Sequence, residues 1–171
     1  MSPFVVLVGT MGAGKTSVGR RLAVLEELPF RDSDADIEAA EGRSVADIFV
    51  DAGEPYFREL ERAAVAEALQ THEGVLALGG GAVVDPETRE LLAGQRVVFL
   101  RVGLGAAADR VGLGVSRPML LGNIRGRIKQ LIDERTPIYE SVAAHVVDTD
   151  GLSIDDVVTA VRVALAGAHH D

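Results

Sequence analysis

The residues Gly9-Thr10-Met11-Gly12-Ala13-Gly14-Lys15-Thr16 follow the pattern G-x-x-x-x-G-K-[ST], which is typical of a phosphate-binding loop. The glycines let the backbone approach an anion closely, so several N–H groups can converge on one phosphate at the start of a helix. Lys15 would place a positive charge at the β- and γ-phosphates, and the Thr16 hydroxyl would bind Mg2+. A plain glycine-rich turn is the alternative, but residue types, spacing and flanking segments all favour the loop.

Two carboxylates follow at Asp32 and Asp34, where a short strand after the first helix should end. Ligands of an open parallel sheet bind beyond the carboxyl ends of its strands, but a solvated turn that caps the next helix explains this spacing equally well. A phosphate-binding loop needs a second group to hold Mg2+, directly or through water. The later strands end on Gly79 and Arg101 and offer no aspartate there. The balance therefore favours a functional role for the pair.

Arg58 lies near the first turn of a helix expected to run from Gly53-Glu54-Pro55 to about His72. The dipole of a helix disfavours a cation at that end, so helix stability alone would not choose this residue. A surface arginine paired with Glu54 or Glu61, four residues before it and three after, is the competing explanation. From the sequence both interpretations of Arg58 stay open.

Glycines also follow the third expected strand, at Gly79-Gly80-Gly81. They allow the backbone to approach a ligand at the edge of the sheet where the binding crevice should lie. Further along, Gly112 and Gly114 precede Arg117-Pro118, which indicates a mobile lid at about 112–124 that brings positive charge over the nucleotide. A disordered surface loop is the alternative for this segment.

These residues need a scaffold of alternating strands and helices to bring them together. Residues 4–8 are continuously apolar and β-branched, as in a strand buried on both faces, and similar short runs recur at 75–78, 97–100 and 145–148. About five parallel strands with helices on both sides predict a three-layer α/β domain. A helix is expected from about Asn123 to Tyr139, with Pro137 bending or ending it.

Composition limits the function classes. The 171 residues are 47% hydrophobic and 25% charged, which suits one globular domain spanning 1–171. A net charge of −9 argues against a general nucleic-acid or membrane surface. The chain has no apolar run long enough to cross a bilayer and no basic leader at its start, so we expect a cytoplasmic protein. The absence of cysteine excludes disulfides and thiolate metal sites but does not decide the compartment.

Several motifs follow one another along the chain: the loop, Asp32-Ser33-Asp34, Gly53-Glu54-x-x-Phe57-Arg58-x-x-Glu61, Leu78-Gly79-Gly80-Gly81, Arg117-Pro118 and Arg135-x-Pro137-x-Tyr139. With these motifs in this order, the chain resembles the shikimate kinases over nearly its whole length. The resemblance implies a P-loop kinase fold with a substrate-binding helical segment at about 33–61 and a lid. It also implies ATP-dependent phosphorylation of the 3-hydroxyl of shikimate, with Mg2+ as cofactor, by a monomer.

The resemblance further implies roles for individual residues. Catalysis would involve Lys15, Asp34 as candidate base, and Arg117. Shikimate would be bound by Asp34, Arg58, Gly79, Gly80, Gly81 and Arg135. ATP would be bound by Gly12, Ala13, Gly14, Lys15, Thr16, Ser17, Arg110, Arg117 and Pro118, with Arg110 and Pro118 against adenine, and Mg2+ by Thr16 and Asp32.

A gluconate-type sugar-acid kinase is the nearest alternative, since it shares the loop and the substrate chemistry without requiring every arginine. A nucleoside monophosphate kinase would have Asp-Gly-x-Pro-Arg where this chain has Gly79-Gly80-Gly81-Ala82. A regulatory GTPase would need an Asn-Lys-x-Asp motif, and neither Lys15 nor Lys129 follows an asparagine.

Overall fold

The computed structural model describes residues 2–10, 12–107 and 118–167, without the side chains of 118–125. Within these ranges, five strands form one parallel sheet in the order β2-β3-β1-β4-β5. Central β1 is paired on both sides, with Val6 opposite Leu76 of β3 and Val97 of β4. The strands are β1 (Val5–Val8), β2 (Phe30–Asp32), β3 (Val75–Ala77), β4 (Val97–Arg101) and β5 (His145–Asp148). The predicted five-stranded α/β fold is confirmed.

Helices connect the strands and begin or end where local sequence signals place them. The left-handed backbone at Gly42 ends one helix, and the side chains of Ser44, Asp85 and Ser153 accept backbone N–H groups at the starts of three others. The helices are α1 (Lys15–Glu26), α2 (Ser33–Glu41), α3 (Val45–Ala52), α4 (Glu54–Thr71), the 3-10 turn η1 (Ala82–Val84), α5 (Pro86–Leu92), α7 (Pro118–Val142) and α8 (Ile154–Gly167).

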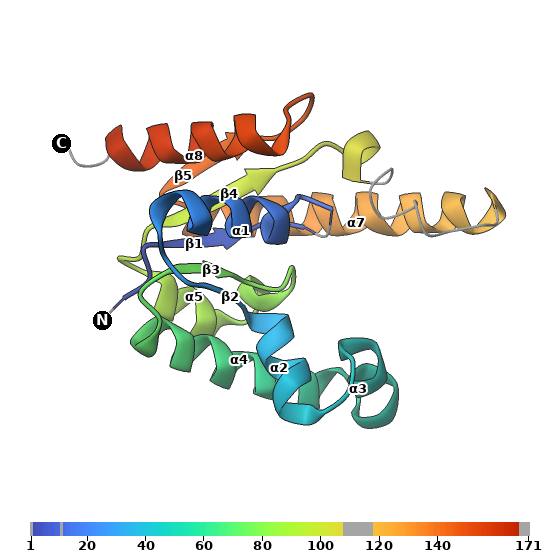
Figure 1. Cartoon of the computed structure of the whole chain (residues 1–171). Coiled ribbons are helices and arrows are strands. Elements are labelled where there is room, and N and C mark those ends of the chain that lie inside the picture. The colour runs from blue at the N-terminus through green and yellow to red at the C-terminus, as the bar shows by residue number, and fades with distance from the viewer. Residues whose placement is uncertain (1, 11, 108–117, 168–171) are drawn as a thin grey trace.

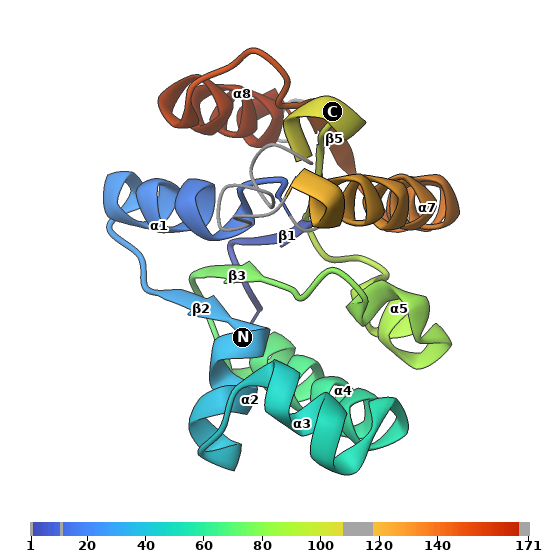
Figure 2. The same ribbon diagram turned by 90° about the vertical axis from the view of Figure 1, so that its right-hand side faces the viewer.

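The sheet is the middle layer of three, because alternate residues of its strands pack against helices on opposite sides. Val5 and Leu7 of β1 contribute to a core cluster with α1 and α8. Val6 and Val8 contribute to a second cluster with α4, α5 and Tyr139 of α7. Figures 1 and 2 show α1 and α8 on one side of the sheet and α4 and α5 on the other. Both faces of the central strands β1, β3 and β4 are therefore buried, as their continuous apolar sequences predict, whereas the outer strands β2 and β5 are partly exposed.

A smaller core holds together the segment that leads from β2 to α4. Ile37 of α2, Ile48 of α3 and Phe57 of α4 are buried against one another. The rings of Phe49 and Phe57 lie 4.7 Å apart, centre to centre. In Figure 1 these helices extend past the carboxyl ends of the strands. The segment can therefore form one wall of a site at that edge of the sheet.

Helix α7 differs from the expectation at both ends. It begins at Pro118 rather than near Asn123, so the segment expected to form a lid from 112 to 124 overlaps its first two turns. Proline suits a first helical position because its missing N–H would have no intrahelical partner there. The helix also continues through Pro137 to Val142. Internal proline costs about 3 kcal/mol, and burial of the following Tyr139 offsets this cost.

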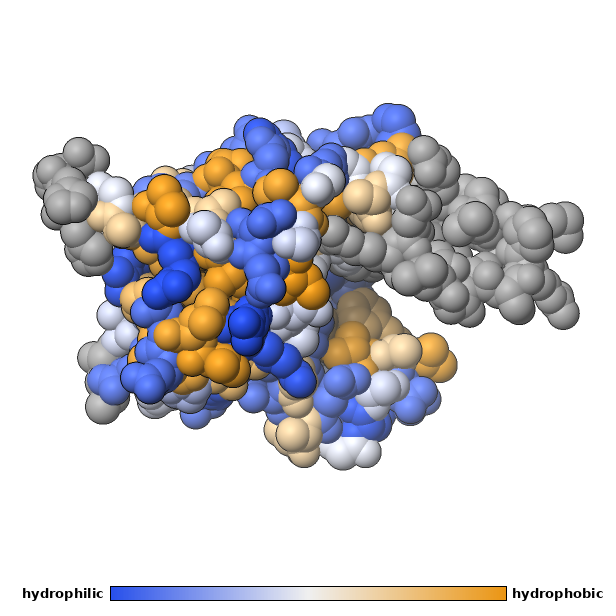
Figure 3. Space-filling model, turned by 45° about the horizontal axis from the view of Figure 1, so that its top comes forward, coloured by the Kyte–Doolittle hydropathy of each residue, from blue (hydrophilic) through white to orange (hydrophobic). Residues whose placement is uncertain are grey.

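No helix among the described residues is long and apolar enough to cross a membrane. Figure 3, turned so that α8 comes forward, shows hydrophobic side chains interspersed with hydrophilic ones on that face. The exposed apolar residues include Val24 of α1 and Val163 of α8. Scattered exposure of this kind is usual for a protein surface.

Candidate active site

The loop after β1 has the backbone of a phosphate-binding site. Gly12 and Gly14 adopt φ angles of 80° and 88°, which residues with a Cβ rarely take, and Gly14 caps the start of α1. The Lys15 ammonium group donates to the carbonyl oxygens of Gly9 at 2.7 Å and Thr10 at 3.0 Å. The lysine is thus folded back over the loop at the positive end of a helix, where an anion is favoured.

Thr16 and Asp32 come together beside this loop. The Thr16 hydroxyl donates to Asp32 Oδ2 at 3.1 Å. The other carboxylate oxygen, Oδ1, accepts the backbone N–H groups of Asp34 and Ala35 and so caps α2. Capping fixes the carboxylate, which leaves two oxygen atoms of the kind that Mg2+ binds at one point of the phosphate site. The described residues hold no cluster of three His, Cys, Asp or Glu suited to a metal, and Mg2+ in phosphate sites does not need one.

Asp34 occupies the centre of the site. Its Oδ1 is buried and has no hydrogen-bond partner among the described residues. Burial raises the pKa of this carboxyl, the charge of Asp32 raises it further, and Lys15 opposes the change. Burial also lowers the pKa of Lys15 to about 8, against the attraction of Asp34 and Asp32. A half-buried carboxyl whose Oδ1 has no other partner is suited to accept a hydrogen bond from a hydroxyl group of a ligand.

Gly79 leaves the space that Asp34 occupies. A Cβ at position 79 would lie 2.5 Å from Asp34 Oδ1, which is closer than real Cβ contacts come. The N–H of Gly79 donates to Ser33 Oγ at 3.0 Å, which joins the end of β3 to the start of α2. The glycine is therefore required by the position of the aspartate, and the two strand ends are fixed to each other.

Two cavities meet at Asp34. One, of about 330 Å3, is lined by the phosphate loop, Asp32, Asp34 and residues 78–80. The other, of about 360 Å3, is lined by Asp34, residues 79–81, Arg58 and Arg135, with Phe49 and Phe57 as an apolar wall. Because Asp34, Gly79 and Gly80 line both, a phosphate in the first cavity and a hydroxyl compound in the second would be neighbours.

The arginine cavity is held in shape by buried contacts. Arg58 Nη1 donates to Glu61 Oε1 at 2.8 Å, and Arg58 Nη2 lies 3.3 Å from Glu54. The Glu61 side chain is only 3% exposed, and burial raises its pKa although Arg58 lowers it. A Cβ on Gly81 would lie 2.5 Å from Arg58 Nη2, so this glycine makes room for the guanidinium. Arg58 is thus ion-paired and also lines the cavity, which combines the two interpretations that the sequence left open.

A third hollow adjoins the phosphate loop on its other side. It measures about 240 Å3 and is bounded by Ala13, Gly14, Ser17 and Val18, and by residues that follow β5 or lie in the first turn of α8. Those residues are Thr149, Leu152, Ile154 and Val157. The walls are mostly apolar, which suits a flat nucleobase or a ribose next to its phosphates. Nothing in the sequence pattern indicated that residues so distant from the loop would lie beside it.

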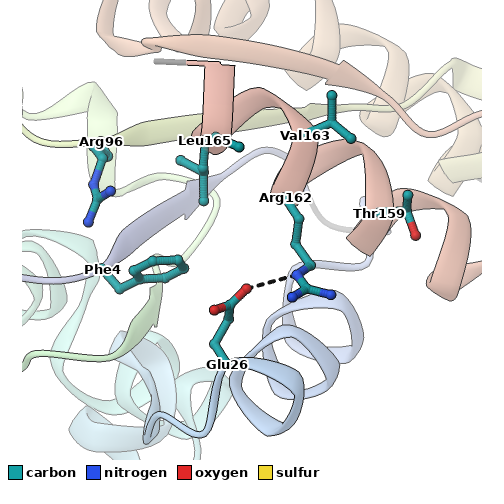
Figure 4. A pocket seen from close by; sticks show the side chains of 8 residues that line it. Phe4, Glu26, Arg96, Thr159, Arg162, Val163 and Leu165 are labelled. Carbon is teal, nitrogen blue, oxygen red and sulfur yellow. Dashed lines mark hydrogen bonds and ion pairs between the residues drawn. The ribbon is translucent and has the colours of Figure 1, made fainter. Parts of the chain in front are cut away.

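A larger hollow, of about 460 Å3, lies at the opposite end of the sheet between Phe4, Glu26 and α8. There Arg162 Nε donates to Glu26 at 2.8 Å, and the guanidinium of Arg96 lies 4.9 Å from the centre of the Phe4 ring (Figure 4). None of the predicted site residues that the structure describes lines this hollow. Its position at the amino ends of the strands separates it from the phosphate loop.

Comparison with known proteins decides the family. A family model described as shikimate kinase matches residues 11–166. The chain belongs to the shikimate kinase family. A curated shikimate kinase of Frankia casuarinae is 56% identical over 161 residues, which are 94% of this chain and 72% of that protein.

Solved structures agree with this assignment. A shikimate kinase from Acinetobacter baumannii, described as a complex with shikimate, is 33% identical, with a TM-score of 0.90 over 98% of this chain and 94% of that one. A gluconokinase from Sinorhizobium meliloti is 21% identical, with a TM-score of 0.64 over 96% and 91% of the two chains, and that likeness shows the fold alone. The prediction of a shikimate kinase with a P-loop kinase fold is confirmed.

The described residues bring together most of the site predicted for this family member. The loop residues 12–17, together with Asp32, Asp34, Arg58, Gly79, Gly80, Gly81 and Arg135, line the phosphate cavity, the arginine cavity or the third hollow. Arg110 and Arg117 lie outside the described residues, and Pro118 is described only as the first residue of α7.

Two contributors were not predicted as site residues. Glu61 was considered only as a surface partner of Arg58, and its buried position is set by the helix face that it shares with Phe57 and Val65. Tyr139 is buried at the far end of α7, and its hydroxyl donates to the carbonyl of Gly80 at 2.5 Å. Because Tyr139 follows Arg135 by four residues, the sequence could have predicted that both lie on one face of the helix. It could not have predicted that Tyr139 contacts the loop Gly79–Gly81.

Proposed function

We propose that this member of the shikimate kinase family transfers the γ-phosphoryl group of ATP to the 3-hydroxyl of shikimate. The observation that carries the proposal is the meeting of a phosphate cavity and an arginine cavity at Asp34. Shikimate has one carboxylate and several ring hydroxyls. It therefore calls for cationic groups at one end of a cavity and a hydroxyl acceptor at the other.

On the substrate side, Arg58 and Arg135 would bind the carboxylate of shikimate, since guanidinium groups grip carboxylates with paired hydrogen bonds. Glu61 and Glu54 orient Arg58 in advance, which reduces the entropy lost on binding. The backbone of Gly79, Gly80 and Gly81 would contact the ring hydroxyls at close range. Asp34 would accept a hydrogen bond from the hydroxyl that reacts.

On the nucleotide side, Gly12, Ala13, Gly14 and Lys15 would bind the phosphates of ATP. The fit of Mg2+ to the site rests on Thr16 Oγ1 and Asp32 Oδ2, which lie 3.1 Å apart beside the loop. These two oxygens would hold the ion, directly or through water. When bound, Mg2+ would neutralise charge on the transferring phosphoryl group. The third hollow beside Ser17 would take the nucleoside.

The transfer forms a bond between the shikimate hydroxyl oxygen and the γ-phosphorus and breaks the bond from that phosphorus to the β–γ bridging oxygen. ADP leaves with the electron pair, and the hydroxyl proton passes to Asp34 and then to solvent. The transition state of such transfers is largely dissociative, so Asp34 acts mainly by positioning the hydroxyl. Lys15 and the loop N–H groups stabilise the developing charge.

The roles that we propose for the lid residues rest on the sequence. Arg117 would stabilise charge on the phosphoryl group when the segment at 112–117 closes, and Arg110 and Pro118 would lie against adenine. Closure would also exclude water, which otherwise competes as phosphoryl acceptor. We further propose that 1–171 works as a single domain, as a cytoplasmic monomer, with no nucleic acid or membrane as partner.

A coupled ADP-release assay, with shikimate and gluconate offered separately in the presence of ATP and Mg2+, tests the proposal. We expect rapid ADP release with shikimate only. A purified protein that consumes ATP with gluconate, or that leaves shikimate unchanged, would contradict it.

A further inference from the structure

A third arginine lines the cavity that holds Arg58 and Arg135. Arg127 stands two turns before Arg135 on α7, and Leu131 stands between them, so the three residues share one face of the helix. Leu131 is buried, at 7% exposed, which fixes the direction of this face toward the protein. Arg127 itself is exposed, as expected for a residue at the mouth of the cavity.

The charges of this cavity balance only because Arg127 is present. Its described ionisable lining comprises three carboxylates and three guanidinium groups: Asp34, Glu54, Glu61, Arg58, Arg127 and Arg135. Besides Asp34, which both cavities share and which is counted above, the adjoining phosphate cavity adds only Lys15 and Asp32, whose formal charges cancel. Without Arg127 the lining would carry one net negative charge, in a chain whose net charge is −9. An anionic substrate would then meet repulsion on entering.

Arg127 differs from Arg58 in how its own charge is used. Arg58 is committed to Glu61 and Glu54, whereas Arg127 Nη1 donates to the neutral amide oxygen of Gln130 at 3.2 Å. No carboxylate of the described residues forms an ion pair with Arg127. Its positive charge therefore acts on the cavity and on approaching ions, and does not cancel locally.

We propose that Arg127 is a substrate-steering residue that draws the carboxylate of the substrate into the arginine cavity by its charge. The inference rests on the proposed function. Attraction of this kind accelerates binding and weakens as salt rises, because mobile ions screen charges beyond about 8–10 Å at ordinary ionic strength. A point charge is sufficient for it, so lysine should replace Arg127 without large loss.

The test compares Arg127→Gln with Lys129→Gln. Both variants remove one positive charge from the exposed surface of α7, but Lys129 pairs with Asp133 at 2.6 Å and does not line the cavity. At low salt we expect Arg127→Gln to lower kcat/KM for shikimate by about fivefold with kcat and the KM for ATP nearly unchanged. The loss should shrink below about twofold at 0.5 M salt, a concentration with a Debye length of about 4 Å. Lys129→Gln and Arg127→Lys should stay close to the wild type.

The outcomes separate this inference from the proposed function. If the wild type does not phosphorylate shikimate, both fall. If it does, equal kcat/KM for Arg127→Gln and Lys129→Gln overturns the role of Arg127 alone. A loss that persists at high salt, and that Arg127→Lys shares, also overturns it, because a direct two-pronged contact would then be responsible. Thermal unfolding of each variant checks that the fold is kept, and Arg127→Lys tests the charge if glutamine disturbs the helix.

Discussion

Replacing Gly79 with alanine tests whether the position of Asp34 controls turnover. The added Cβ would lie 2.5 Å from Asp34 Oδ1 and 3.0 Å from Oδ2. Ordinary contacts of a Cβ begin near 3.4 Å, so the carboxylate must move by roughly 1 Å. The backbone at Gly79 does not have a positive φ, so alanine is tolerated there by the main chain itself. The effect of the substitution is therefore an effect on Asp34.

The size of the effect follows from this displacement. Overpacking of a close contact costs about 1–3 kcal/mol, and a loss of about 2 kcal/mol should lower the Tm of a domain this long by about 4–8 °C. Misplacement of a reacting group by roughly 1 Å reduces turnover by about 100-fold. We therefore expect Gly79→Ala to fold, to melt earlier, and to lose about two orders of magnitude in kcat.

Coupled ADP release at saturating ATP and shikimate, together with thermal unfolding, measures both effects. Gly167→Ala is the control, since a Cβ there meets open space at the end of α8, far from the site. Asp34→Ala supplies the second control, because it removes the carboxylate that the new methyl group displaces. In that background Gly79→Ala should cost little further activity or stability.

Either of two results would refute this reasoning. A kcat for Gly79→Ala within about twofold of the wild type would mean that the carboxylate moves without consequence. An equal loss of stability in the presence and absence of the Asp34 carboxylate would mean that the methyl group collides with something else.

Three further predictions concern the charged residues. Arg58→Lys should raise the KM for shikimate by about tenfold or more with little change in ATP binding, because the two-pronged grip is lost; unchanged shikimate kinetics would remove Arg58 from the site. Arg117→Ala should lower kcat more than it weakens shikimate binding, since the lid arginine acts on the phosphoryl group; the reverse pattern would mean that it only holds substrate. Asp34→Asn should lower kcat by at least about 100-fold yet raise Tm at pH 7. Burial, and then the charge of Asp32, raise the pKa of Asp34 above its ordinary value of 3.8, so the folded protein binds this proton more tightly than the unfolded chain. The contribution of Asp34 to stability is then fully present below pH 3.8 and is lost as pH rises through the folded pKa. The difference in Tm between Asp34→Asn and the wild type should therefore narrow on acidification. A difference in Tm that stays constant with pH would contradict a raised pKa of Asp34.

Features set by neighbouring residues were predictable from the sequence. The loop at 9–16 is contiguous, so strand, anion site and helix could be placed together before any tertiary contact was known. The helix boundaries at Gly42, Ser44 and Ser153 are local in the same way, because each depends on a side chain or a backbone angle within three residues.

Features set by tertiary packing were not predictable in the same way. The sequence predicts that Pro137 bends or ends the helix, but the helix continues to Val142, because burial of Tyr139 beside the sheet outweighs the lost hydrogen bond. The hollow next to Ser17 arises because the start of α8 packs against α1, a contact between segments more than 130 residues apart. Local patterns carry no information about such a pairing.

Several groups held at a cost to stability line the phosphate cavity or the arginine cavity. Asp34 Oδ1 and Glu61 Oε2 are buried without a hydrogen-bond partner among the described residues, and burial lowers the pKa of Lys15 to about 8. An unpaired buried polar atom costs about 1–3 kcal/mol, and solvent exposure would remove that cost. The fold instead keeps these atoms in the walls of two adjoining cavities, of which Asp34 lines both, supported by apolar cores on both faces of the sheet. Hydroxyl groups of a substrate would donate hydrogen bonds to these carboxylate oxygens, which would favour a ligand rich in hydroxyls.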